Sequence, residues 1–126
     1  MKRTALGFGL LAGLLALGIV TSSAMEKHHA PIKTALDAAA GSVAEENWDG
    51  AQMLLQEART RWEKGWRADA ALADHAPMEQ IDALFARLQE FCREEDTGEF
   101  AAGCRELSRL VEAMTDAHRL SWWNLL

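Results

Sequence analysis

A seven-residue period in residues 47–66 constrains the fold of this chain more than any other feature of its sequence. Large side chains recur there at Trp48, Leu55 and Trp62. Residues seven apart lie on the same face of a helix, so this spacing predicts a helix with one apolar face. The small residues that share this face are Ala51, Ala58 and Gly65. Alternating large and small side chains predict close packing against another helix.

Composition supports an all-α fold with a single core. The chain has 126 residues and two prolines, and it is rich in Ala, Leu, Glu and Arg. Without Lys2 and Arg3, the 13 basic residues fall to 11 against 19 acidic residues, a net charge of −8 for residues 25–126. An acidic body repels phosphate backbones, so we expect no nucleic-acid partner.

The first 24 residues predict a membrane-targeting segment. Lys2 and Arg3 precede an apolar run from Ala5 to Val20, which spans about 24 Å as a helix. Ser22 and Ala24 provide the small residues that a signal peptidase requires for cleavage before Met25. Residues 1–24 are therefore either a cleaved signal peptide or a retained signal anchor. Both alternatives place the rest of the chain outside the cytoplasm, either secreted or held at the membrane.

The remaining chain predicts an antiparallel bundle of about four helices. Residues 25–30, which include His28 and His29, are expected to be a solvated polar spacer rather than a metal site. The bundle domain then covers residues 31–126. Its helices are predicted at 31–46, 48–74, 77–94 and 98–120, with Pro31 and Pro77 in first turns and Asn47 as an N-cap.

The apolar stripes of these helices predict the core. We expect it to contain Trp48, Leu55, Trp62, Ile81, Leu84, Phe85, Leu88, Leu107, Val111 and Met114.

Few side chains are candidates for chemistry. His75 and Glu79 are four residues apart, and His118 lies near the predicted end of the last helix, so the three side chains are weak candidates for a metal or acid–base site. The sequence has no Gly-rich phosphate loop and no dense Cys/His cluster, and we expect no cofactor and no enzymatic activity.

Cys92 and Cys104 are predicted to form a disulfide. If the turn between the last two helices is centred near Gly98, facing residues have numbers that add to about 196, which pairs the two cysteines. An oxidising compartment favours the bond. The alternative is a pair of buried free thiols that pack as small hydrophobic side chains.

The segment that follows the last predicted helix is strongly apolar and contains Trp122 and Trp123. Four antiparallel helices would return these indole rings to the end of the bundle nearest the membrane. The rings are therefore expected either to close that end of the bundle, which is the favoured alternative, or to contact the bilayer surface or a partner.

Several motifs resemble a family that is known only as a domain of unknown function. They are N-W-D-G-A, R-W-E-K-G-W, D-H-A-P-M-E-Q-I-D-A-L-F-A-R-L and S-W-W-N-L-L, in order between Asn47 and Leu126. The family comprises short bacterial proteins, typical of Firmicutes, with an N-terminal anchor and a helical extracytoplasmic part. The resemblance implies this layout and transfers no catalytic residues.

Two classes of function follow from the sequence. The first is a non-enzymatic interaction or accessory protein at the outer face of the membrane, with an unknown membrane or cell-surface protein as its partner. The alternative is a secreted metal-binding protein or metal-dependent enzyme that uses His75, Glu79 and His118.

Overall fold

The computed structural model of this protein describes the backbone of residues 1–72 and 75–124, and the side chains of residues 1–20, 23, 27–65 and 78–117. The described backbone contains four helices and no strand. The helices are α1 (Lys2–Ala44), α2 (Trp48–Leu72), α3 (His75–Arg93) and α4 (Thr97–Asn124). The predicted all-α class is confirmed.

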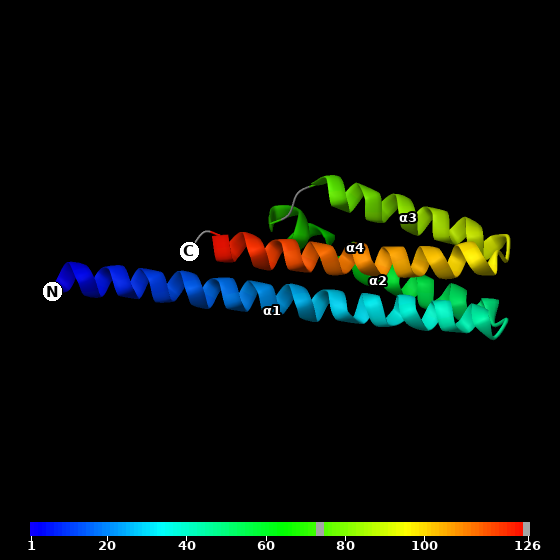
Figure 1. The fold of residues 1–126 in the computed structure, drawn as a ribbon, viewed down its shortest axis with the longest axis horizontal. Coiled ribbons are helices and arrows are strands. Elements are labelled where there is room, and N and C mark those ends of the chain that lie inside the picture. The colour runs from blue at the N-terminus through cyan, green and yellow to red at the C-terminus, as the bar shows by residue number, and fades with distance from the viewer. Residues whose placement is uncertain (73–74, 125–126) are drawn as a thin grey trace.

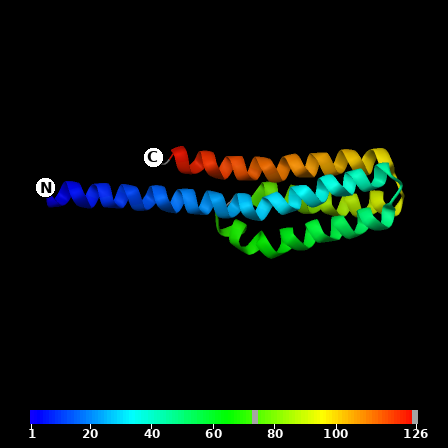
Figure 2. The same cartoon turned by 90° about the horizontal axis from the view of Figure 1, so that it is seen from below.

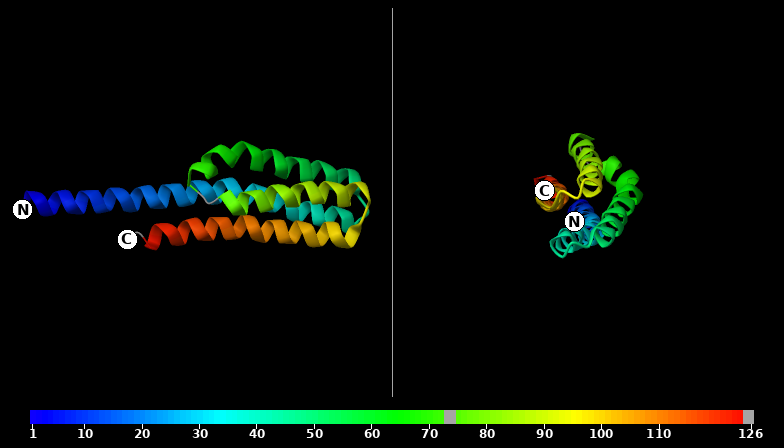
Figure 3. Two further views of the ribbon diagram at one scale, coloured as in Figure 1. Left: turned by 90° about the horizontal axis from the view of Figure 1, so that it is seen from above. Right: turned by 90° about the vertical axis from the view of Figure 1, so that its right-hand side faces the viewer.

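Successive helices run antiparallel (Figure 1). Helix α1 packs against α2 and α4, and α3 packs against α4 and, less extensively, against α2. The α1–α2 and α3–α4 turns share one end of the bundle, which we call the tip. The first half of α1 leaves the opposite end, which we call the base, and projects alone beyond the other helices (Figures 2 and 3).

Helix α1 differs from the sequence prediction because it is continuous through residues 25–30. The predicted polar spacer is helical, and Pro31 lies inside the helix rather than in its first turn. Proline has no N–H to donate within a helix and costs roughly 3 kcal/mol in the interior of an isolated one. Burial on both sides of Pro31 offsets this cost, because His29, Ile32 and Leu36 are almost completely inaccessible to solvent.

The seven-residue face of α2 is buried as predicted. Leu55, Ala58 and Trp62 lie in the core, whereas Trp48 is only half-buried and packs edge-on against Phe100, with ring centroids 5.7 Å apart. The other predicted core residues are all buried. The Trp62 indole N–H donates to the Asp82 carboxylate of α3 at 2.8 Å, so this buried polar group is paired.

Both turns at the tip have the same backbone design. Glu46 and Glu95 adopt left-handed φ values of 59° and 53° directly after the ends of α1 and α3. The N–H of the following residue, Asn47 or Asp96, bonds to a carbonyl five residues earlier, as in a Schellman motif. The same Asn and Asp side chains then accept an N–H bond three residues later, which caps α2 and α4.

Truncation of Trp62 tests the importance of the α2 face. We expect Trp62→Ala to lower the free energy of unfolding by about 3–5 kcal/mol, because it opens a cavity and leaves Asp82 without its donor. Trp62→Phe removes mainly the hydrogen bond and should cost about 1–3 kcal/mol. Urea unfolding followed by circular dichroism measures both values. Equal stability of Trp62→Ala and the wild type would contradict this assignment.

The left-handed glutamates predict a gain in stability on substitution by glycine. Glu46→Gly and Glu95→Gly should each raise the free energy of unfolding by about 0.5–1 kcal/mol, because glycine adopts positive φ without a Cβ clash. For Glu95→Gly the matched control is Glu94→Gly, since it removes the same charge from the same turn at a residue without positive φ. Urea unfolding should show no gain for this control, and a loss for Glu46→Gly or Glu95→Gly would contradict the prediction.

Candidate functional site

A buried polar contact joins α1 and α4 near the base of the bundle. His29 is 1% exposed, and its Nδ1 lies 2.7 Å from the Thr115 hydroxyl. That hydroxyl donates its only proton to the Val111 carbonyl at 3.3 Å, an arrangement that requires His29 Nδ1–H to be the donor to Thr115. A paired imidazole therefore lies within an otherwise apolar interface.

His28 and Gly65 form a second close contact, between α1 and α2. A Cβ atom at position 65 would collide with the His28 imidazole, so only glycine allows the two helices to approach this closely. The His28 Nε2 atom is buried there and has no hydrogen-bond partner among the side chains that the structure describes. The two histidine rings lie 5.5 Å apart, and the His29 ring lies 6.3 Å from that of Trp62.

These contacts and the Trp62–Asp82 hydrogen bond form what we call the polar layer. Its members come from all four helices: His28, His29, Trp62, Gly65, Asp82 and Thr115. Neither the His29 imidazole nor the Thr115 hydroxyl is open to a substrate, because both residues are buried. The arrangement can hold the four helices in one relative position, since each hydrogen bond forms only when the two helices that it joins are in one axial register.

The sequence prediction for residues 25–30 missed the burial of His29, although the sequence holds a signal for it. His29 continues the helical row of Ile32, Leu36, Ala39 and Val43, all of which are buried. The helix predicted at residues 31–46 begins with Pro31, because proline favours a first turn, and this start leaves His29 outside the helix. Extending the helical period through the proline places His29 on the buried face.

The three weak metal candidates are not all described. Glu79 lies on the exposed surface of α3, and the side chains of His75 and His118 lie outside the described residues. Among the described side chains, no group of three or more His, Cys, Asp and Glu residues is placed to hold a metal ion. The metal hypothesis therefore stays a prediction.

The predicted disulfide between Cys92 and Cys104 is wrong, because both cysteines are free and buried. Helix α3 ends at Arg93 and α4 begins at Thr97, which centres the turn near residue 95 rather than residue 98. Facing residues then have numbers that add to about 190. In agreement, a Cβ atom on Gly103 would collide with the Leu88 side chain, so residues 88 and 103, whose numbers add to 191, face each other. The two cysteines are thus about six residues out of register, or about 9 Å along the helix axis, too far for a disulfide.

The surroundings of the two thiols favour the neutral form. Burial raises the pKa of Cys104 to about 12, with a smaller contribution from the negative charge of Asp37. Burial likewise raises the pKa of Cys92, which also lies near Glu95 and Asp49. Cys92 lines a cavity of about 260 Å³ between α2 and α3, whose other lining residues are Gln52, Leu55, Gln56, Gln89 and Arg93.

The raised pKa of Cys104 predicts a loss of stability at alkaline pH. Below pH 9.0 the thiol is neutral in both the folded and the unfolded chain. Between pH 9.0 and about 12 only the unfolded chain loses the proton, so stability falls as pH rises, by at most about 1.4 kcal/mol per pH unit. In Cys104→Ala the free energy of unfolding should fall less steeply over this range.

Urea unfolding of wild type and Cys104→Ala at several pH values measures this difference in slope. Parallel slopes would contradict the prediction. Titration of the denatured wild type should find both thiols free, which checks that no disulfide contributes to the comparison.

The predicted contact residues Trp122 and Trp123 have side chains outside the described residues. Their backbone belongs to α4, which continues to Asn124, beyond the predicted end of this helix at residue 120.

Comparison with known proteins gives a family without a known activity. No curated protein matches the chain, and no solved structure matches it. A family model described as "Domain of unknown function (DUF4363)" matches residues 19–125, which cover the end of the apolar run, the rest of α1 and the whole of α2, α3 and α4. The chain therefore belongs to the DUF4363 family, a domain of unknown function.

Proposed function

We propose that this protein is a non-enzymatic interaction or accessory protein that the first half of α1 holds at the outer face of a membrane. The continuity of α1 carries the proposal. A single helix provides both an exposed apolar segment and the buried row Ile32, Leu36, Ala39 and Val43 of the bundle. Anything that moves or restrains the apolar segment therefore acts directly on the core.

The apolar segment has the properties of a membrane-spanning helix. Residues Lys2–Val20 are long and apolar enough to cross a membrane, by length and composition. At about 1.5 Å per residue these 19 residues span about 28 Å, close to the roughly 30 Å of a hydrocarbon core. Leu6, Phe8 and Leu10 are 66–69% exposed, so the bundle leaves most of this segment uncovered, although Gly18 near its end is buried. A lipid bilayer would bury it.

The structure favours a retained anchor over a cleaved signal peptide. The cleavage position after Ala24 lies inside the continuous helix α1, five residues before buried His29. Cleavage there would expose the unpaired N–H groups of a new helix end directly beside the polar layer. The family match also begins at residue 19, so it includes the last two residues of the apolar run.

The charge distribution supports an extracytoplasmic bundle. Lys2 and Arg3 precede the apolar segment and favour the cytoplasmic side, while residues 25–126 carry a net charge of −8, from 11 basic and 19 acidic residues. Such a body gains little from anionic headgroups, which leaves a membrane or cell-surface protein as the proposed partner. No described contact favours the metal-dependent alternative with His75, Glu79 and His118, which stays a prediction.

Placing a charge in the apolar segment tests the anchor. Leu10→Arg should move the full-length protein from the membrane fraction to the soluble fraction, because arginine near the centre of a spanning helix costs about 2.5–3.5 kcal/mol. Met53→Arg is the matched control. Leu10 and Met53 are 66% and 74% exposed, so neither change disturbs the core, but Met53 belongs to the bundle.

Carbonate extraction of cell membranes measures the distribution of both variants, and intact mass shows whether residues 1–24 are retained. Purification of the wild type in mild detergent should also recover a stoichiometric membrane or cell-surface protein. If Leu10→Arg and Met53→Arg distribute alike, the anchor is wrong. If the purified wild type carries no partner, the interaction role is wrong.

A further inference from the structure

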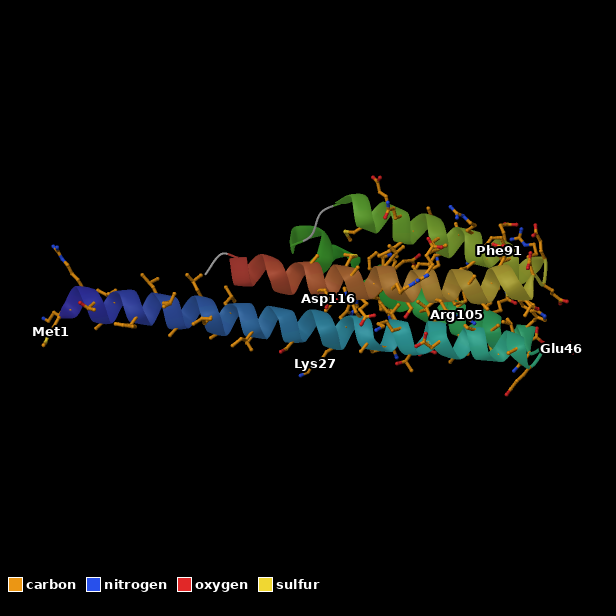
Figure 4. The ribbon with its side chains drawn as sticks, viewed as in Figure 1. Met1, Lys27, Glu46, Phe91, Arg105 and Asp116 are labelled. Carbon is orange, nitrogen blue, oxygen red and sulfur yellow. The ribbon has the colours of Figure 1, made fainter. Side chains whose placement is uncertain are left out.

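Two contacts fix the register between α1 and α4. The His29 imidazole contacts the Thr115 hydroxyl at 2.7 Å, and the Lys33 ammonium pairs with the Glu112 carboxylate at 3.2 Å. The residue numbers in these two pairs add to 144 and 145. Figure 4 shows a closely similar register slightly nearer the base, where Lys27 of α1 and Asp116 of α4 lie at about the same level along the bundle.

This register places the end of α4 at the boundary of the apolar segment. Both helices continue without a break toward the base, α1 back to Lys2 and α4 on to Asn124. If numbers of facing residues add to 144 or 145, Asn124 lies at the level of residues 20–21. Val20 is the last residue of the segment that is long and apolar enough to cross a membrane. The end of α4 and the end of the apolar segment of α1 therefore lie at the same level along the bundle axis.

We infer that the end of α4 is a second membrane contact, at which Trp122 and Trp123 enter the interface of the bilayer that α1 crosses. The inference rests on the proposed anchor. With residues 5–20 in the hydrocarbon and Lys2 and Arg3 on its cytoplasmic side, positions 122 and 123 lie at the level of residues 21–23, where the hydrocarbon gives way to headgroups. Indole rings concentrate at this depth, because they combine a large apolar surface with one N–H donor.

The charges along α4 are compatible with this depth. The last acidic side chain of the helix is Asp116, which lies at the level of residues 27–29 and so about 10–14 Å above the level of Val20. Between positions 117 and 124 the sequence contains one arginine and no acidic residue. No carboxylate side chain of α4 therefore has to enter the headgroup region.

Quenching of tryptophan fluorescence by brominated lipid tests the contact in the full-length protein. The probe is a phosphatidylcholine vesicle with bromine near the headgroup end of the acyl chains. We expect the lipid to quench the wild type and most of this quenching to be lost in the double variant Trp122→Phe/Trp123→Phe. Trp48→Phe is the matched control and should keep the quenching, because Trp48 begins α2 at the tip.

Flotation of the same vesicles separates this inference from the proposed anchor. If the wild type does not float with the vesicles, the anchor itself is wrong. If the wild type floats but is not quenched, or if the double variant is quenched as strongly, the rings pack within the bundle and the inference is overturned. Circular dichroism of the double variant should match that of the wild type, which confirms that the substitutions leave the helices intact.

Discussion

The rest of the structure depends on the continuity of α1. This helix packs against both α2 and α4, so it forms the central support of the bundle as well as the segment that leaves it. Its buried row spans residues 29–43 and faces both neighbours. A break at Pro31 would separate His29 from the rest of this row. The burial of the row offsets the hydrogen bond that proline cannot make.

The polar layer gives the bundle a specificity that apolar packing alone does not provide. Contacts between apolar helix faces are non-directional, so one helix can slide along another by a turn at little cost. A buried imidazole or indole N–H, in contrast, needs its acceptor within hydrogen-bond distance. The contacts of His29 with Thr115 and of Trp62 with Asp82 meet this need across two different helix pairs. The layer lies near the base, and its residues His28 and His29 belong to the same helix as the apolar segment.

The tip is built on local interactions instead. Its two turns repeat one arrangement, a left-handed glutamate followed by an Asn or Asp cap, and both are stabilised by main-chain bonds within six residues. The turns therefore take their hydrogen bonds from neighbouring residues, while the contact between Trp48 and Phe100 packs the first turns of α2 and α4 against each other. The bundle combines locally determined turns at the tip with long-range polar contacts at the base, where the protein is proposed to meet the membrane.

The sequence by itself determined the helical class, the heptad face of α2, the cap at Asn47 and nearly all of the core. These features depend on residues less than about eight positions apart, and a helical period expresses them directly. The tertiary structure alone decided the continuity of α1 through Pro31, which extends the buried row to His29, and the free state of the two cysteines. Each of these depends on the register between segments far apart in the chain. The predicted centre of the α3–α4 turn was three residues too late. Across the hairpin this error shifts the pairing of facing residues by six, which wrongly placed Cys92 opposite Cys104.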